Sequence, residues 1–396
     1  MNMMLQPITS EAERYLKALA DTLALPHGRY RQAKERYESL GEWLLRTAST
    51  VRQYDPQIYV QGSFRLGTAI KPWDAAEHYD VDSACVMRNL SKSNLTQFEL
   101  KRMLGVEIAS YAEAHSMENG VDEGNRCWIL EYADGAQFHM DIVPAVPNGN
   151  EYEQMLKGLG IANPWAKTAI AITDRRLPTY WVRTLDWPRS NPKGYAAWFY
   201  DRAEPVATWM GDSQMRIRGE VESMPAAQPN RTPLQSAIMI LKRHRDQMFA
   251  DHRDIRPISV IITTLAAHAY QGEPTIGAAL VSVLTGMRTY IGHRNGEFRI
   301  PNPAEPLENF AEKWNQKPEL EKAFSLWLEQ ARDDFSRAAG LSRRQDIADV
   351  VAPRIGRSLA DRARDISGGL LTEGLVSSPA VARTAPVRLE GGGRNA

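Results

Sequence analysis

Apolar residues in the first 50 positions recur with the period of an α-helix. Two helical segments are predicted within residues 9–50, with a break at the sequence LPHG. The second segment carries large apolar side chains at helical spacing, namely Tyr30, Ala33, Tyr37, Leu40, Trp43 and Leu44. We interpret it as an amphipathic helix that packs against the rest of the protein.

The next part of the chain contains short apolar runs that are typical of strands. Helices are predicted at residues 95–116 and 151–170, and strands at 58–60, 79–87, 126–132 and 136–146. Strands mixed with helices in this way indicate an α/β lobe that spans roughly residues 50–200.

From about residue 230 onward the pattern is almost wholly helical. The first of these helices opens with Thr232 as N-cap, Pro233 in the first helical position and Gln235 completing a capping box. One of its faces is apolar, with Leu234, Ile238, Leu241 and Met248. Further helices are predicted at residues 258–270, 274–289, 304–314 and 318–339. The composition then turns to Gly, Ser, Pro and Ala, and we expect residues 367–396 to form a flexible tail.

Charge and cysteine content limit the possible partners and the compartment. Lys plus Arg and Asp plus Glu both total 48, so no overall positive field favours nucleic acid, and nucleic-acid binding is not indicated. Cys85 and Cys127 lie in apolar runs without zinc-ligand spacing, which is typical of buried thiols in a reducing compartment. The first residues lack the pattern of a signal peptide, and the apolar stretch ISVIITTLAAHAY is too short to cross a bilayer. We therefore expect a cytoplasmic protein without a membrane partner.

The stretch VQGSFRLGT places Gly62 and Ser63 directly after a strand and before the basic residue Arg65. A Gly-Ser step at such a turn brings the backbone close to a ligand and leaves N–H groups free, as phosphate sites require. The alternative is an ordinary turn, because Gly and Ser are common turn residues.

Two carboxylates follow in the run YDVDSACV. Side chains alternate between the faces of a strand, so Asp80 and Asp82 project from one side, about 7 Å apart at the backbone. A divalent cation would relieve their repulsion, because it prefers hard oxygen ligands. The alternative is a solvated edge strand, but Val81 and the following Ala-Cys-Val favour a buried one.

A third acid, Asp141, lies in the apolar run FHMDIVPAV, where an unpaired carboxylate is costly. Three strand-borne carboxylates after a Gly-Ser turn are the set that two-metal nucleotidyl transfer requires. Lys242, mid-helix among apolar residues, and Ser259, at the start of the next apolar helix, are candidates for the anion-binding side. The alternatives are a lysine that extends to solvent and a serine that serves only as an N-cap.

These segments together resemble the polymerase-β-like nucleotidyltransferases. Within that superfamily the chain is similar to the bacterial cyclic-oligonucleotide synthases of anti-phage CBASS systems, which are relatives of cyclic GMP–AMP synthase and oligoadenylate synthase. The resemblance covers roughly residues 55–315 and includes QGSFRLGT, YDVDSACV, HMDIVPA, GYAAWF, LQSAIMILKRHRD, ISVIITTLAAHAY and NPAEPLENFAEKW.

The resemblance implies an α+β fold, in which a nucleotidyltransferase lobe with a mixed sheet and flanking helices packs against a helical lobe. The expected divisions are N-terminal helices that brace the two lobes, the catalytic lobe, the helical lobe and the tail, at residues 1–50, 51–205, 206–366 and 367–396.

The same resemblance implies roles for the candidate residues. Gly62 and Ser63 would hold the triphosphate with Lys242 and Ser259, and Gln61 would contact the nucleotide beside them. Asp80, Asp82 and Asp141 would bind two Mg²⁺ ions, with Mn²⁺ as a substitute, and Asp141 would help to deprotonate the attacking hydroxyl. The insertion AIKPWDAAEH would form a loop near the nucleotide, which leaves the roles of Lys71 and His78 open. His139 shares a strand face with Asp141 and is either an orienting group or, more simply, a satisfied polar neighbour.

The implied activity is synthesis of a cyclic di- or trinucleotide from nucleoside triphosphates, with ATP among them. Two alternatives are a transferase that acts on an RNA end or on a protein, and a catalytically silent nucleotide-binding scaffold. The implied partners are a HORMA-type activator or a ubiquitin-transfer-like enzyme that would join Ala396 to a target. For the tail, the alternative is a disordered end without a function.

Overall fold

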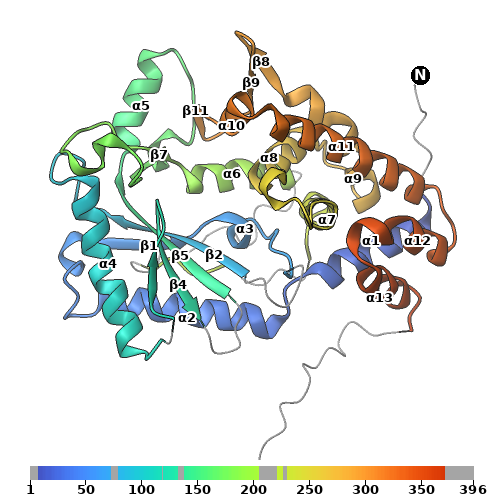
Figure 1. Cartoon of the computed structure of the whole chain (residues 1–396), viewed down its shortest axis with the longest axis horizontal. Helices are drawn as coiled ribbons and strands as arrows, with labels where there is room; N and C mark the ends of the chain where they lie inside the picture. The colour runs from blue at the N-terminus through green and yellow to red at the C-terminus, as the bar shows by residue number, and fades with distance from the viewer. Residues whose placement is uncertain are drawn as a thin grey trace, which may run out of the picture.

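The computed structural model describes residues 8–72, 79–117, 119–132, 138–204, 221–225 and 230–370. These residues form a sheet lobe and a helical lobe (Figure 1), each with its own apolar core. The sheet lobe occupies one end of the molecule with α4 (Gln97–Ala114) at its outer edge. The helical lobe occupies the other end, where α1 (Ser10–Leu23), α12 (Arg344–Ile355) and α13 (Arg357–Ser367) lie together.

A mixed sheet forms the first lobe. The described strands run in the order β1-β2-β5-β4-β3, with β6 attached to the far end of β5 and β7 to β6. β2 and β5 are parallel, whereas β1 pairs with β2, and β4 with β5, in antiparallel fashion. Their bounds are β1 Pro56–Val60, β2 Tyr79–Met87, β3 Val121–Glu123, β4 Trp128–Tyr132, β5 Phe138–Pro147, β6 Ile170–Ile172 and β7 Arg189–Ser190.

Two helices cover the sheet and bury one face of it. α2 (His27–Leu45) packs on β1 and α4, and α4 packs in turn on β3, β4 and β5. α4 begins with a capping box between Thr96 and Glu99, which satisfies backbone N–H groups that the first helical turn leaves unpaired. Short helices complete the lobe, namely α3 Gly62–Arg65, α5 Gly149–Gly158 and the 3₁₀ turns η1 Arg52–Tyr54, η2 Ala166–Thr168 and η3 Pro178–Trp181.

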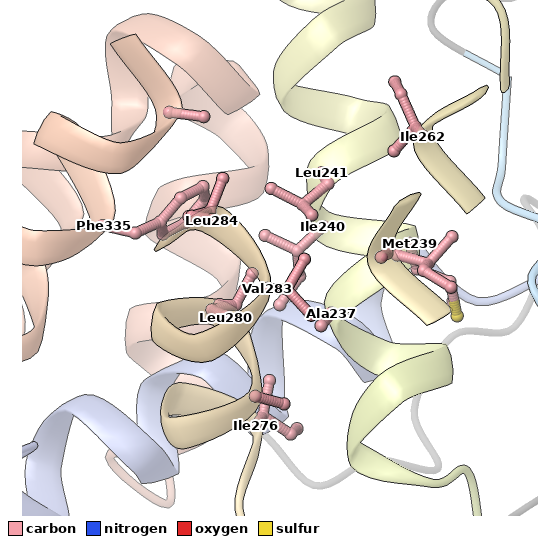
Figure 2. Packing of buried hydrophobic residues seen from close by; sticks show 14 of the residues in the cluster. Ala237, Met239, Ile240, Leu241, Ile262, Ile276, Leu280, Val283, Leu284 and Phe335 are labelled. Atoms are coloured by element: carbon pink, nitrogen blue, oxygen red, sulfur yellow. The ribbon is translucent and has the colours of Figure 1, made fainter. Parts of the chain in front are cut away.

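The centre of the helical lobe is α7 (Pro233–Met248), which is buried from Leu234 to Asp246. The predicted capping box of Thr232 and Gln235 is confirmed. Figure 2 shows Ala237, Ile240 and Leu241 of α7 against α9 (Ile276–Gly286). α6 (Pro192–Ala203), α8 (Ser259–Ala269) and α11 (Pro318–Ala339) also pack on α7. The lobe further contains α10 (Glu312–Gln316) and the 3₁₀ turns η4 (Arg253–Ile255) and η5 (Met287–Tyr290).

The first two helices belong to different cores. Tyr15 and Leu19 of α1 lie in the core of the helical lobe, whereas Tyr37 and Leu40 of α2 lie in the core of the sheet lobe. The chain therefore passes from one lobe to the other within the short break between α1 and α2. Residues 66–72 form a second crossing, because Leu66 packs in the helical core although α3 packs on β2.

Two predicted helices are wrong in part. The helix expected at 151–170 ends at Gly158, since Gly160 takes a left-handed φ of 70° and Pro164 follows. The helix expected at 304–314 is instead strand β11 (Glu305–Asn309) followed by α10, because prolines at 301, 303 and 306 disfavour a helix. β11 pairs with β10 (Pro301–Asn302).

A further hairpin interrupts the helical lobe. Strands β8 (Gly292–Arg294) and β9 (Glu297–Arg299) meet at Asn295-Gly296, where both residues have positive φ. The predicted tail falls largely outside the described residues, which end at Leu370. Among the described helices, none has both the length and the apolar character that crossing a membrane requires.

Candidate active site

A cavity of about 670 Å³ lies where the two lobes meet. Its floor comes from the sheet lobe, with Ser63, Asp80, Asp82 and His139. Its opposite wall comes from α7 and the segment before α8, and loop residues 69–72 close one side. The wall residues include Lys242, Arg245, Asp246, Arg253, Asp254, Arg256 and Ser259. Basic side chains therefore outnumber acidic ones on the wall.

Strand register brings the acids together. Asp80 and Asp82 alternate with Val81 on β2, and the parallel partner β5 places His139 opposite Asp80 and Asp141 opposite Asp82. Residues directly opposite each other in a ladder project from the same face of the sheet. All three carboxylates and the imidazole thus share one face.

Burial and the repulsion from neighbouring carboxylates oppose ionisation of Asp82 and Asp141 in the free protein. Burial, and then the neighbouring Asp80 and Asp141 charges, raise the pKa of Asp82 to about 6. Burial also raises the pKa of Asp141. Asp80 lies 2.7 Å from the Nε2 atom of His139, and this contact raises the pKa of that imidazole. The site consequently favours a cation that would stabilise the ionised carboxylates.

Two details of the floor fit a divalent ion. The Oδ1 atom of Asp141 is buried without a hydrogen-bond partner, while Oδ2 accepts a bond of 3.4 Å from the Cys127 thiol. Gly62 has a left-handed φ of 61°, and a Cβ atom there would lie 2.2 Å from Oδ2 of Asp82. Glycine is therefore needed for the close approach of this backbone to the carboxylate.

Within the described residues, no group of three or more Asp, Glu, His or Cys side chains is already arranged to hold an ion. This is compatible with Mg²⁺, which commonly takes one or two carboxylates and completes its six ligands with water and substrate phosphate oxygens. The three Asp residues fit such an ion as a partial ligand set.

The Gly-Ser turn lies against β2. The backbone N–H of Gln61 donates a 2.8 Å hydrogen bond to the Asp82 carbonyl, and α3 begins directly afterwards at Gly62. Ser63 lines the cavity, whereas Gln61, Gly62 and Asp141 are adjacent in the fold to lining residues but do not line it themselves. Arg65 points elsewhere, because its guanidinium pairs with Glu222 at 3.0 Å and donates to the Val60 carbonyl.

Lys242 and Ser259 both line the wall. Lys242 is only 7% exposed, so it does not extend to solvent, and its ammonium donates a 2.9 Å hydrogen bond to the Thr68 carbonyl. Burial, and then nearby Arg245, lower its pKa to about 8. Ser259 is the first residue of α8, and Ile258 is the N-cap, so the interpretation of Ser259 as only an N-cap is wrong.

Of the two residues of the predicted loop, Lys71 and His78, the structure describes only Lys71. Lys71 lines the cavity but donates its ammonium hydrogen to the Thr22 carbonyl at 2.8 Å. His78 lies outside the described residues. The charged wall residues that sequence reasoning missed are Arg245, Asp246, Arg253, Asp254 and Arg256. A signal existed for the first two, since they follow Lys242 by three and four positions and so share its side of the helix.

Comparison with known proteins shows what this site is similar to. Residues 56–144 match the sequence profile of the cyclic GMP-AMP synthase DncV-like nucleotidyltransferase domain, a region that contains Ser63 and all three acids. Over this region the chain is similar to the DncV-like nucleotidyltransferases. A c-di-GMP synthase from Roseivirga ehrenbergii is 26% identical over 398 residues, which cover 96% of this nucleotidyltransferase and 97% of the relative. The cyclic dinucleotide synthase CdnG from Bradyrhizobium diazoefficiens is 23% identical, over 90% of this chain and 83% of the relative.

Solved structures confirm the predicted fold of this nucleotidyltransferase. CdnG from Bradyrhizobium diazoefficiens, in complex with GTP, matches with a TM-score of 0.65 at 21% identity, over 89% of this chain and 98% of the other. A mutant of Vibrio cholerae DncV, with ATP and GTP bound, matches with a TM-score of 0.56 at 12% identity, over 88% of this chain and 97% of the other. Escherichia coli CdnC, solved with a HORMA protein, matches with a TM-score of 0.58 at 13% identity, over 87% of this chain and 97% of the other.

Proposed function

We propose that this nucleotidyltransferase joins nucleoside triphosphates into a cyclic dinucleotide. The observation that supports this best is the cavity between the two lobes, which is lined by Asp82 from the sheet lobe and by Lys242 from the helical lobe. Asp141 lies opposite Asp82 in the β-ladder. Both relatives found by sequence, a c-di-GMP synthase and the cyclic dinucleotide synthase CdnG, align over nearly the whole chain. Neither an RNA-end transferase nor a silent scaffold has comparable support.

Asp80, Asp82 and Asp141 are the residues that would hold Mg²⁺, with two ions as the proposed number. Bound there, Mg²⁺ would lower the pKa of the attacking hydroxyl and neutralise charge on the triphosphate. The chain supplies the rest. Ser63, Lys242 and Ser259 would donate hydrogen bonds to phosphate oxygens, and Asp141 would take the proton of the attacking hydroxyl. Gln61 and Gly62, which do not line the cavity, would act by fixing the turn.

In each transfer a ribose hydroxyl oxygen forms a bond to the α-phosphorus of a second nucleotide. The bond from that phosphorus to the bridging oxygen breaks, and pyrophosphate leaves with the electron pair. A second transfer within the linear product closes the ring. The volume of the cavity lies within the usual range for ligand pockets. A third addition before closure, giving a trinucleotide, is the proposed variant of the same chemistry.

The test is product analysis with purified protein, Mg²⁺ and ATP, GTP or both. We expect pyrophosphate release and a phosphatase-resistant product whose mass corresponds to a cyclic dinucleotide. Asp82→Ala should abolish release while the circular dichroism spectrum stays that of a folded protein, because loss of a metal ligand removes metal-dependent catalysis. Phosphatase-sensitive linear products or nucleotide attached to protein would instead favour the RNA-end or protein transferase. Substantial activity of Asp82→Ala would contradict the site.

A further inference from the structure

The wall of the cavity contains a charged network that the proposed chemistry has not used. Arg245 Nη1 donates to the Ser259 hydroxyl at 2.8 Å and to the Pro257 carbonyl at 3.0 Å. Its other side faces Asp246, whose Oδ1 accepts from Nε at 2.9 Å and from Nη2 at 2.5 Å. Arg256 Nη1 donates to the same Oδ1 at 3.2 Å.

The two central members of this network are buried although they border the cavity. Arg245 is 6% exposed and Asp246 is 9% exposed. Buried charged groups persist when they are paired and hydrogen-bonded, and a planar guanidinium can bind on two sides at once. Asp246 binds one edge of the guanidinium and so fixes the direction in which Nη1 points, which is toward the start of α8.

The direction of the bond to Ser259 has a chemical consequence. A serine hydroxyl has one hydrogen to donate and lone pairs that accept. Arginine can only donate and stays charged at every physiological pH. Because the Ser259 oxygen accepts from Arg245, its single hydrogen is left to point elsewhere, and the hydroxyl lines the cavity. The Pro257 carbonyl is likewise bound to Arg245, so its negative end is not presented to an incoming anion.

We infer that Arg245 is a positioning residue that sets the Ser259 hydroxyl as a hydrogen-bond donor to a nucleotide phosphate, and that Asp246 holds Arg245 in the required orientation. Arg245 acts through Ser259 and not by its own contact with the nucleotide. The inference rests on the proposed function, in which Ser259 contacts phosphate, and assigns how that contact is prepared before the nucleotide arrives.

A double-mutant cycle on nucleotide binding tests this inference. Affinity for a non-hydrolysable nucleoside triphosphate is measured by calorimetry for the wild type, Arg245→Lys, Ser259→Ala and the double variant. We expect each single change to weaken binding about tenfold, the size of one charge-assisted hydrogen bond. In the Ser259→Ala background, Arg245→Lys should add less than about twofold, since coupled residues are not additive.

Additive effects would overturn the inference, because they would mean that Arg245 binds the nucleotide itself or only supports the fold. If Arg245→Lys does not fold, Asp246→Asn replaces it in the same cycle with the same expected coupling. Arg357→Lys is the matched control, since Arg357 also pairs with an aspartate, Asp349, at 2.6 Å but has an exposed side chain and does not line the cavity. The affinity of the Arg357→Lys variant should equal that of the wild type. Absence of nucleotide binding by the wild type would also overturn the inference, whereas intact binding without pyrophosphate release would contradict only the proposed function.

Discussion

Lys242 is buried, cationic and directed at the cavity, which makes it the wall residue with the clearest dependence on pH. Its pKa is lowered to about 8, so it is charged below that pH and loses its proton as the pH rises through 8. If the charged form contacts phosphate, the KM for nucleotide should rise above pH 8. Lys242→Arg should remove this rise, since arginine remains protonated.

The companion variant Lys242→Ala should raise KM about tenfold or more at pH 7, with a smaller effect on the unfolding temperature. Initial rates of pyrophosphate release across about pH 6.5–9.5 give the KM and its dependence on pH. Thermal denaturation gives the unfolding temperature. An unchanged KM in Lys242→Ala would remove Lys242 from the nucleotide site, whatever the pH profile of the wild type.

Gly62 is the second residue with a decisive geometry. A methyl group added there would overlap Oδ2 of Asp82 in a backbone conformation that alanine rarely adopts. Gly62→Ala should therefore displace Asp82 and lower kcat about a hundredfold, the loss expected from a shift of about 1 Å in a catalytic group. Gly28→Ala is the control, since a Cβ atom at Gly28 meets nothing within 4 Å, and its kcat should match the wild type. Equal activity of Gly62→Ala and wild type would show that Asp82 need not be held in place.

At the scale of elements, a short segment fixes the turn that carries Ser63. Residues 221–225 lie beside β1, where the Glu222 amide donates to the Ile58 carbonyl at 2.8 Å. The Glu222 carboxylate pairs with Arg65 of α3 at 3.0 Å and with Lys193 of α6 at 2.9 Å. Residues 221–225, which are distant in sequence, thus connect α3 to the sheet through contacts with both.

Glu222→Gln should be strongly destabilising, because it removes the carboxylate that pairs with the buried Arg65 and the half-buried Lys193. Breaking a buried ion pair from one side costs about 3–5 kcal/mol, which denaturant unfolding would detect. The control is Glu35→Gln, since the pair of Glu35 with Arg31 is solvent-exposed and contributes about 0–1 kcal/mol. A Glu222→Gln protein as stable as this control would mean that Arg65 and Lys193 do not depend on Glu222.

Local patterns predicted several elements because the determinants are local. The helix expected at 318–339 has those bounds, and the cap at Thr232 was readable from three residues. The Asn295-Gly296 hairpin was equally local, and its signal was overlooked within an otherwise helical region.

Other features depend on contacts between distant parts of the chain. The period of a strand places Asp80 and Asp82 on one face, but only the parallel pairing of β2 with β5 brings Asp141 opposite Asp82. The direction of Arg65 is set by Glu222, which lies 157 positions later in the sequence. No periodicity encodes such partners.

At the scale of the whole molecule, we expect the predicted tail to be separable from synthesis. Residues 391–396 lie far in sequence from every residue of the candidate site, and Ala396 lies outside the described residues. Deleting 391–396 should leave cyclic dinucleotide synthesis unchanged, as measured by pyrophosphate release. If the tail is joined to a target by a ubiquitin-transfer-like enzyme, the covalent adduct seen by mass spectrometry should disappear. An adduct that survives the deletion would contradict the proposed role of Ala396.

The hydrogen bond from Lys242 to the Thr68 carbonyl holds this ammonium in place in the free protein. A lysine ammonium carries three hydrogens, so the backbone oxygen occupies one and the others can still bind an anion. Ser63 and Ser259 line the same cavity, so a triphosphate could contact all three side chains. Because one loop already restrains Lys242, less side-chain entropy would be lost when a nucleotide binds, and the free protein is to that extent preorganised for its ligand.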